Sequence, residues 1–574
     1  MRKLLLLIIL IPVAFGIISA QNLLSPNWKF QTGDQASFFN LDYDESKWVD
    51  IEVGKLWESQ GHDYDGYAWY RLEVKIPKKL KKEAKVNGGL NLFLGKIDDA
   101  DETFWNGKLI GATGKMPPNH EGAYATPRIY KIPFEAINFG ETHLLAVRVY
   151  DNGGGGGIYG NEFHLGLPRM KDLVLIAWAD KNSNQIFNDG NGLELAFELE
   201  NKSKNKLSGE LNIDIKNSFQ KNIGSQNLPV SIKNFGKAKV SFQELNLAPG
   251  FYPSTLSFKS ATEELKKEIV LGVDPTKIIS PPDRPDNFVD YWRRAKKELA
   301  AVEPQFKLTK LEEHSKEKVN VYLLEMRSLG NVLVRGFYSR PKVDGIYPAL
   351  LNVQGYSTSR TANDVYKGDD MVSLVLNIRG HGNSQDNIQG FPGYILNQIE
   401  DPEMYIYRGA YMDCIRAIDF LFEQKEVDQT RVAVAGGSQG GALSIATAAL
   451  DNERIMACAP DVPFLSDFKD YFVIAPWPGG EVFNYIKDHP DFSEEAMYKT
   501  LSYIDIKNLA QDIKAPVFMG IGILDMVCPP HINFAAYNQV TTKKSYVAYP
   551  NAGHGLPAEH YAVKMQWLKK QFGM

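Results

Sequence analysis

Six short apolar runs in the second half of the chain constrain the fold more than any other feature of the sequence. They are rich in Val, Ile, Leu and Ala, and each is followed by turn residues, which is typical of strands buried on both faces. Stretches with helical patterning lie between them. This alternation predicts a mostly parallel, doubly wound α/β sheet. The runs are Tyr347–Gly355, Met371–Gly380, Arg431–Gly437, Ile455–Pro463, Ala515–Asp525 and Lys544–Gly553.

The first half of the chain has the alternating pattern of all-β modules. Segments such as Tyr70–Ile76 and His143–Asp151 are separated by clusters of Gly, Asn, Asp and Pro, as in a β-sandwich. Asn106 and Gly107, between apolar flanks, predict a tight hairpin. A second pattern begins near Pro168 and predicts another sandwich of immunoglobulin-like size.

A chain of 574 residues is too long for one core at about 150 residues a domain, and the two patterns divide it into segments. We predict a multidomain protein in which two N-terminal β-sandwich modules precede an α/β domain. The expected segments are a signal peptide (1–20), a first β-sandwich (21–168), an immunoglobulin-like β-sandwich (169–277) and an α/β domain (278–574).

The first twenty residues have the form of a secretory signal. Arg2 and Lys3 precede an apolar run that Pro12 interrupts, and small residues lead up to Ala20. Cleavage near Ala20 predicts a secreted or periplasmic protein without a membrane attachment, and an uncleaved anchor is the alternative. No Cys stands at the cleavage point, so the sequence does not indicate a lipoprotein anchor.

Charge and cysteine content exclude other classes of protein. A net charge of −5 and a pI near 6.1 give no electrostatic reason to expect a nucleic-acid partner. Cys414, Cys458 and Cys528 lack the spacing of metal ligands. As an odd and sparse set, they also argue against a disulfide framework.

Ser438 is the candidate nucleophile. The sequence Gly436-Gly437-Ser438-Gln439-Gly440 fits G-x-S-x-G, and it falls where a strand is expected to end and a helix to begin. The alternative is a small residue in a tight turn. The placement of the motif favours the nucleophile.

A serine hydroxyl becomes a good nucleophile only when an imidazole, itself held by a carboxylate, takes its proton. In α/β-hydrolases these residues occur in the order Ser, acid, His. Asp525 follows the fifth apolar run and His554 the sixth, so we predict them as acid and base. The rival acid is Asp461, one strand earlier, and the rival bases are His531 and His560, both in expected helices.

Two backbone N–H groups are needed to bind the oxyanion of the tetrahedral intermediate. Gln439, directly after the nucleophile, is predicted to supply one of them. Tyr356, which follows Gly355 in the loop after the first apolar run, is predicted to supply the other. The alternative for Tyr356 is an aromatic side chain that lines this loop without an exposed N–H.

The first β module carries the stretches DDADETFWNGKLIGATG (98–114) and VRVYDNGGGGGIYG (147–160). In these it resembles the galactose-binding-like jelly roll of sialate O-acetylesterases and of some β-glycosidases. The resemblance implies a glycan-binding module in which an exposed aromatic such as Trp105 stacks on a sugar. The alternative places Trp105 in the core and makes the glycine run from Gly153 a flexible loop.

Five ordered motifs mark the segment from about Asp286 to the C-terminus. In them the segment resembles the acetyl xylan esterase and cephalosporin-C deacetylase family, carbohydrate esterase family seven. The motifs are GGSQGG (436–441), DVPFLSDF (461–468), YRGAYMDCIRAIDFL (407–421), TLSYIDIKNLA (500–510) and DMVCPPHINFAAYN (525–538).

The family resemblance implies a nucleophile at Ser438, an acid at Asp525 and a base at His554, with oxyanion donors at Tyr356 and Gln439. It implies removal of O-acetyl groups from xylan-derived or similar saccharides by two-step acyl transfer, without a metal or organic cofactor. The expected partner is an acetylated oligo- or polysaccharide, and a homo-oligomer is left open. Because residues 278–574 contain all of these positions, we expect this segment to hydrolyse small acetyl esters alone.

Two positions depart from the family pattern and leave the shape of the pocket mouth, the assembly state and the natural substrate open. Arg379-Gly380-His381-Gly382 stands where the family commonly has R-G-Q-G, and we interpret His381 as a loop residue that replaces an amide. Gly555 follows the base where the family commonly has Glu. Either a side chain is tolerated at Gly555, or the backbone requires glycine because φ is positive.

Two other classes of function stay open at this point. A secreted serine exopeptidase has the same fold and the same order of catalytic residues. A catalytically silent glycan-binding protein would use the hydrolase domain as a scaffold. The intact set of Ser, Asp and His disfavours the second class.

Overall fold

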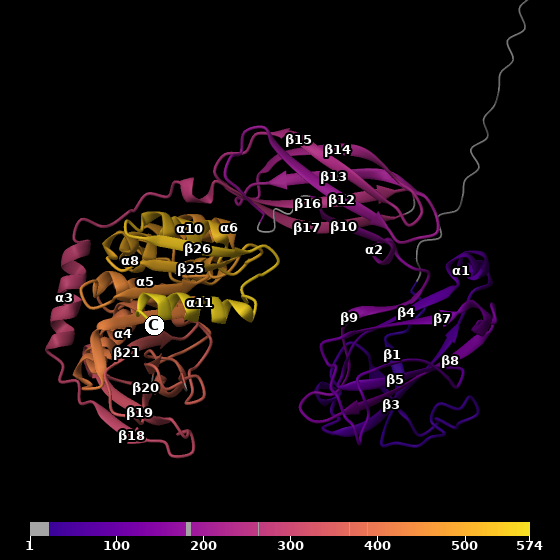
Figure 1. Cartoon of the computed structure of the whole chain (residues 1–574), viewed down its shortest axis with the longest axis horizontal. Helices are drawn as coiled ribbons and strands as arrows, with labels where there is room; N and C mark the ends of the chain where they lie inside the picture. Colours follow the sequence, from indigo (N-terminus) through magenta and orange to yellow (C-terminus); the bar gives the residue numbers. More distant parts are fainter. Residues whose placement is uncertain (1–21, 180–184, 262, 367, 387) are drawn as a thin grey trace, which may run out of the picture.

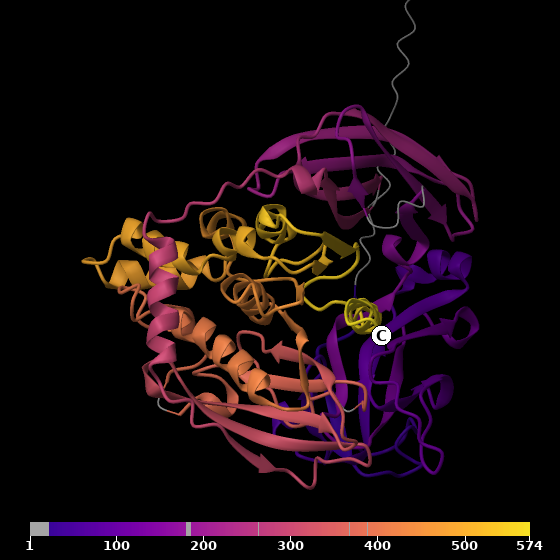
Figure 2. The same ribbon diagram turned by 60° about the vertical axis from the view of Figure 1, so that its left-hand side comes forward.

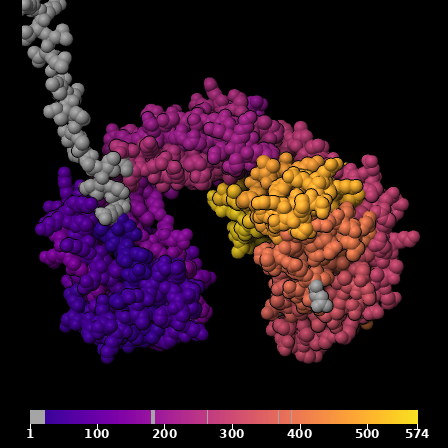
Figure 3. Space-filling model, turned by 180° about the vertical axis from the view of Figure 1, so that it is seen from behind, coloured from indigo at the N-terminus to yellow at the C-terminus, as the bar shows by residue number. Residues whose placement is uncertain are grey.

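The computed structural model describes residues 22–179, 185–261, 263–366, 368–386 and 388–574, so the predicted signal peptide lies outside the described residues. None of the described helices is both long and apolar enough to cross a bilayer. Three bodies follow one another along the chain, and the middle one joins the other two (Figure 1). Figure 3 shows the molecule from behind, with an open space between the first and last bodies.

The N-terminal body consists of two sheets that share one hydrophobic core. Their orders are β2-β1-β3-β8-β5-β6 and β7-β4-β9. Trp28 and Tyr70 of the first sheet and Leu92 and Ile158 of the second belong to the same buried cluster. The elements are β1 (Asn27–Thr32), β2 (Val49–Glu52), β3 (Gly66–Lys75), α1 (Lys81–Asn87), β4 (Gly89–Asp98), β5 (Ala100–Trp105), β6 (Lys108–Thr113), β7 (Pro127–Pro133), β8 (Thr142–Asp151) and β9 (Gly157–Gly166).

The predicted hairpin lies between β5 and β6. Asn106 and Gly107 both have positive φ, 48° and 76°, as a tight two-residue turn requires. Trp105, at the end of β5, is only 1% exposed, and its indole N–H donates to the carbonyl of Ala136. A sugar-stacking role for Trp105 is therefore wrong, because its ring faces the core and stacks on His143.

The end of the glycine run packs on the core, whereas Gly153 and Gly154 at its start are exposed. A Cβ at Gly156 would lie 2.1 Å from Cζ2 of Trp57, so only glycine fits beside this buried indole. The N–H of Gly156 also donates to the carboxylate of Glu58. The run therefore turns the chain into β9 against the core.

The middle body also has two sheets, ordered β10-β12-β15 and β11-β17-β16-β13-β14, around a single cluster. Whether these first two bodies are galactose-binding-like and immunoglobulin-like modules stays a prediction. The elements are α2 (Met170–Leu173), β10 (Val174–Trp178), β11 (Ile186–Phe187), β12 (Leu193–Asn201), β13 (Leu207–Lys216), β14 (Asn222–Ile232), β15 (Lys237–Leu245), β16 (Gly250–Ser260) and β17 (Glu264–Val273).

The C-terminal body is built on a nine-stranded mixed sheet, ordered β18-β19-β20-β22-β21-β23-β24-β25-β26. All six predicted strands are present, and they pair in parallel from β22 to β26. The α/β prediction is thus confirmed. The strands are β18 (Lys307–Lys310), β19 (Val319–Ser328), β20 (Val332–Pro341), β21 (Tyr347–Val353), β22 (Val372–Asn377), β23 (Val427–Gly437), β24 (Ala457–Asp461), β25 (Val517–Gly522) and β26 (Lys544–Tyr549).

Helices cover both faces of this sheet (Figure 2). Leu351 of β21 packs on the face of the large cluster that includes α4 and α5, whereas the neighbouring Leu350 packs with Met565 and Leu568 of α11 on the other face. The helices are α3 (Phe288–Ala300), α4 (Ile406–Glu423), α5 (Gln439–Leu450), α6 (Phe468–Ile474), α7 (Gly479–Asp488), α8 (Glu494–Ile504), α9 (Ile506–Leu509), α10 (Pro530–Gln539) and α11 (Glu559–Gln571).

The middle body packs directly on α10. Ile186 and Phe251 belong to the same buried cluster as the C-terminal body, and the rings of Phe251 and Phe534 lie 5.6 Å apart. Phe219, between β13 and β14, contacts the ring of His531 at the start of α10. The boundary near residue 277 therefore crosses a hydrophobic contact.

We expect this contact to decide how well fragments fold. Residues 169–574 should unfold at nearly the same temperature as the α/β domain of the full chain. Residues 278–574 should unfold several degrees lower, because each buried apolar side chain contributes about 1.5–3 kcal/mol and two are removed. Thermal unfolding of both fragments, with p-nitrophenyl acetate hydrolysis, measures the effect. Equal melting temperatures of the two fragments would contradict the expected loss of stability. A folded but inactive fragment 278–574 would show that the β bodies complete the site.

Candidate active site

Ser438 lies on a sharp turn between β23 and α5. Its φ is +59° and its ψ −122°, a conformation that costs energy in any residue with a Cβ. Two hydrogen bonds hold the turn: the N–H of Ser438 donates to the carbonyl of Asp461 at 2.9 Å, and its carbonyl accepts from the N–H of Phe464 at 3.0 Å. The strained serine is therefore held at the carboxyl end of the sheet.

The glycines around Ser438 allow neighbouring main chain to approach. A Cβ at Gly436 would lie 2.6 Å from the carbonyl carbon of Gly440, and one at Gly440 would lie 2.4 Å from the carbonyl oxygen of Val353. Such distances are incompatible with a side chain unless the backbone moves. The turn thus needs small residues at these positions, as the G-x-S-x-G pattern predicts.

The predicted acid and base are hydrogen-bonded to each other. Nδ1 of His554 donates to Oδ2 of Asp525 at 2.8 Å. The other oxygen of this 2% exposed carboxylate accepts the N–H groups of Val527 and Cys528, both at 2.8 Å. The carboxylate is therefore fixed in orientation, and it selects the imidazole tautomer whose Nε2 can accept a proton.

The rival residues pair elsewhere. Nε2 of His560 lies 2.7 Å from Oδ1 of Asp461, the other oxygen of which accepts from Lys564. His531 lies 3.2 Å from Asp470. Asp461 is thus engaged by a different histidine from the predicted base, and neither rival histidine contacts the carboxylate of Asp525.

Reasoning from the sequence missed the role of Cys528 at this site. Burial raises the pKa of its thiol well above the usual value, and hydrogen bonding with Ser438 and Tyr471 opposes this shift only in part. The thiol is therefore neutral at pH 7, and it lies near the Ser438 side chain. No sequence pattern indicates this contact, since Cys528 comes from the loop after β25.

The two predicted oxyanion residues lie on either side of the turn. Gln439 is the first residue of α5, where the helix dipole favours negative charge. Tyr356 follows β21, with its ring buried among aromatic side chains that include Phe464 and Trp477. In the part of the chain that the structure describes, the backbone N–H groups of Tyr356 and Gln439 have no hydrogen-bond partner.

A cavity of about 280 Å³ adjoins the loop of Tyr356. It is lined by residues 356–359, by residues 380–382 and by the exposed ring of Phe391, among others. A second cavity of about 550 Å³ is lined by residues between Ile388 and Ile406 together with Tyr485. Segment 388–393 therefore contributes to both hollows.

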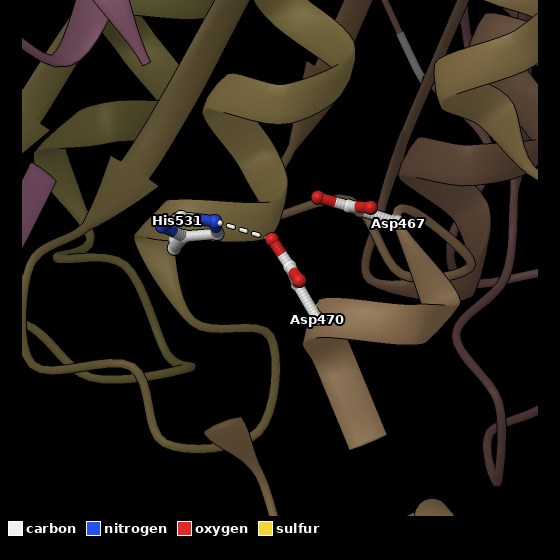
Figure 4. Close-up of side chains that lie close together, drawn as sticks. All are labelled: Asp467, Asp470 and His531. Carbon is white, nitrogen blue, oxygen red and sulfur yellow. Dashed lines mark hydrogen bonds and ion pairs between the residues drawn. The ribbon is translucent and has the colours of Figure 1, made fainter. Parts of the chain in front are cut away.

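Two groups of side chains in the described residues have the spacing of metal ligands. In the first, Asp467, Asp470 and His531 lie close together (Figure 4). Nζ of Lys507 donates to Asp467 at 2.9 Å and the hydroxyl of Ser280 donates to its other oxygen at 2.6 Å, so a cation already balances this carboxylate.

The second group, Asp98, Asp99 and Asp151, lies in the N-terminal body. Burial and the neighbouring carboxylates raise the pKa of Asp98 to about 7, so it holds a proton near neutral pH. Neither group includes a residue predicted for catalysis.

The two departures from the family pattern differ in their surroundings. His381 is buried, and burial lowers its pKa, so its ring is neutral near pH 7. Gly555 does not have a positive φ, and no atom lies within 4 Å of the position of a Cβ. The idea that the backbone requires glycine at 555 is therefore wrong.

Gly555→Glu is expected to keep kcat on p-nitrophenyl acetate within about tenfold of the wild type, a barrier change of about 1.4 kcal/mol or less. The new side chain enters open space beside the base, so it should alter the preference between short and long acetylated oligosaccharides or the oligomer mass. Gly555→Ala is the matched control and should behave as wild type. Equal losses in both variants would show that an added Cβ itself is not tolerated.

Comparison with known proteins identifies the family of the chain. The family profile described as acetyl xylan esterase (AXE1) matches residues 277–571, more than half of the chain. The acetyl esterase Axe7A of Xylanibacter ruminicola is 29% identical over 356 residues, which cover 60% of this chain and 79% of that protein.

Two solved structures of acetyl xylan esterases are also similar. Acetyl xylan esterase 1 of Thermoanaerobacterium sp. is 31% identical, with a TM-score of 0.49, and the match covers 52% of this chain and 98% of that one. The acetyl xylan esterase of Paenibacillus sp. R4 is 32% identical with the same coverage and TM-score.

Proposed function

Because the chain belongs to the acetyl xylan esterase family and is a carboxylic ester hydrolase, we propose that it removes O-acetyl groups from xylan-derived or similar saccharides with Ser438, His554 and Asp525 as catalytic residues. The observation that carries the proposal is the bond between Nδ1 of His554 and Asp525 at the edge of the sheet where Ser438 lies on its strained turn. The family makes an acetylated saccharide the substrate class.

The reaction proceeds by two acyl transfers. Oγ of Ser438 attacks the acetyl carbonyl while Nε2 of His554 takes its proton. The same imidazole then protonates the leaving sugar hydroxyl, which releases the deacetylated saccharide and leaves an acetyl-enzyme. Water attacks this ester by the reverse proton transfers and releases acetate. Asp525 holds the imidazole in orientation and stabilises the imidazolium.

The charge that develops on the carbonyl oxygen needs two donors. The N–H groups of Tyr356 and Gln439 serve this role in our proposal, and each such donor contributes about 3 kcal/mol to the barrier reduction in a water-poor site. The neutral thiol of Cys528 does not compete with the Ser438 hydroxyl as a nucleophile, because its raised pKa keeps it protonated.

We also propose that the protein is exported. The N-terminal sequence has the pattern of a cleaved signal, with basic residues before an apolar run and small residues up to Ala20. Mass spectrometry of the protein from an exporting host tests this point: a mature chain that begins near Gln21 supports it, and a full-length chain contradicts it.

The substrate class is tested with a panel of acetylated saccharides and with acetate release as the readout. Acetylated xylooligosaccharides, acetylated glucose oligomers and p-nitrophenyl acetate should release acetate, with the xylan-derived substrates turned over most efficiently. Aminoacyl p-nitroanilides should not be cleaved. Cleavage of the anilides without acetate release would instead favour an exopeptidase, and retention of glycan without any hydrolysis would favour a silent binding protein.

A further inference from the structure

His381 is a buried imidazole that contacts both proposed oxyanion residues. It is 4% exposed, and its Nε2 lies 2.5 Å from the carbonyl oxygen of Tyr356. The same nitrogen lies 3.3 Å from the side-chain amide nitrogen of Gln439. A carbonyl can only accept a hydrogen bond, so Nε2 carries the proton and donates it to Tyr356.

The ring of His381 cannot easily turn away from this position. It meets the ring of Tyr394 edge-on, with 4.5 Å between the centroids. Its Nδ1, which carries no proton in this tautomer, lies 3.3 Å from the carbonyl of Arg379 without donating to it. Tyr394 in turn donates its hydroxyl to the same carbonyl of Arg379. Arg379 is fixed by a buried two-point ion pair with Asp413, at 2.9 and 2.7 Å.

Both peptide groups that flank Tyr356 are therefore held. In a planar trans peptide group the C=O and N–H point in opposite directions. The carbonyl of Gly355 accepts from the Gln439 side chain at 3.4 Å, which sets the direction of the Tyr356 N–H in that same peptide group. The carbonyl of Tyr356, in the next peptide group, is held by His381. Rotation of the Tyr356 N–H would break the bond at the Gly355 carbonyl. The bond to His381 holds the following peptide group and thereby the position of Tyr356 itself.

We infer that His381 is a positioning residue for the oxyanion site: its hydrogen bond to the Tyr356 carbonyl fixes the peptide group after Tyr356 and so keeps this residue, with its N–H, in place beside the reacting carbonyl oxygen. The inference rests on the function proposed above. It assigns no proton-transfer step to His381, because its Nε2 proton is already engaged by a backbone carbonyl. Both the neutral and the protonated ring keep this donor, so the hydrogen bond persists across the working pH range.

The test compares two substitutions at this position. His381→Phe keeps a ring against Tyr394 but removes the donor, and it should lower kcat on p-nitrophenyl acetate by about 10- to 100-fold with KM changed less than threefold. This loss stays below that expected when an oxyanion donor is deleted outright, about 10²- to 10³-fold. His381→Gln places an amide N–H near the same carbonyl and should recover kcat to within about fivefold of the wild type.

A second readout follows the oxyanion site directly. A small alkyl boronic acid forms a tetrahedral adduct with an active-site serine, and its oxygen occupies the oxyanion position. Its inhibition constant should rise in His381→Phe by about the same factor as kcat falls, and it should stay near wild type in His381→Gln.

The matched control is His143→Phe in the N-terminal body. His143 is also buried, and its Nε2 lies 3.0 Å from the carbonyl of Asn138, so the substitution removes a similar bond far from Ser438 along the chain. This variant should keep the wild-type kcat and inhibition constant. Melting temperatures of all variants separate a loss of stability from a loss of positioning.

The outcomes distinguish this inference from the proposed function. If Ser438→Ala is inactive while His381→Phe has the wild-type kcat and boronate affinity, the positioning role of His381 is wrong and the esterase mechanism stands. If His381→Gln is as impaired as His381→Phe, the donated hydrogen bond is not the cause and the inference also fails. If Ser438→Ala stays active, the proposed mechanism itself fails.

Discussion

Ser438→Ala is expected to abolish acetate release, with kcat on p-nitrophenyl acetate reduced about a million-fold, the magnitude found when the nucleophile of a comparable triad is deleted. The hydroxyl is the atom that forms the acetyl-enzyme, and no neighbouring group replaces it, because the Cys528 thiol is kept protonated by burial. The fold should persist. The two hydrogen bonds that hold the turn use only the main chain of Ser438, so alanine keeps both.

Ser444→Ala is the matched control for this experiment. Ser444 lies on the same helix α5, is fully buried, and donates its hydroxyl to the carbonyl of Gly440 at 2.7 Å. Its loss should cost about 1 kcal/mol of stability and leave kcat within threefold. Activity above a few per cent in correctly folded Ser438→Ala, measured against this control, would show that another residue is the nucleophile.

The fold of the C-terminal body follows from the sequence wherever strands are buried on both faces. The six apolar runs could be recognised because a buried parallel strand needs apolar residues at nearly every position. The three strands that were not predicted, β18 to β20, form the antiparallel edge of the sheet. All four residues of β18 are exposed, and β19 alternates, so neither carries a continuous apolar run. Periodicity alone gives a weak signal for such edge strands.

The site was predictable where local turns and chain order decide it. Ser438 requires a glycine-rich turn that is visible in the sequence, and the places of Asp525 and His554 follow from the strand order. The contacts of His381 with Tyr356 and Gln439 join two separate loops and the start of α5, and no spacing rule connects them. Long-range side-chain contacts of this kind emerge only from the packing.

Two further features of the structure also depend on long-range packing. A sugar-stacking role for Trp105 follows only from the resemblance of the first module to sugar-binding domains, yet the ring is buried in the core that the two sheets share. The contact of Phe251 with Phe534 also joins residues that the sequence assigns to separate modules. A boundary drawn from a change of pattern can therefore cross a shared core.

Asp525→Asn is expected to lower kcat about ten-thousand-fold while leaving the fold intact, because the substitution reverses the tautomer of the base. The oxygen of an amide at 525 would face the N–H groups of Val527 and Cys528, which now bond to Oδ1. The NH₂ group would then face His554 and donate to Nδ1. That places the imidazole proton on Nε2, so the ring can no longer accept the proton of Ser438.

Asp461→Asn separates this effect from a general loss of charge near the turn. Asp461 bonds His560 and Lys564 rather than the predicted base, so its substitution should lower the melting temperature and keep kcat within about tenfold. Kinetics on p-nitrophenyl acetate with thermal unfolding of both variants provide the comparison. A larger loss of kcat in Asp461→Asn than in Asp525→Asn would make Asp461 the catalytic acid, and it would require His560 instead of His554 to serve as the base.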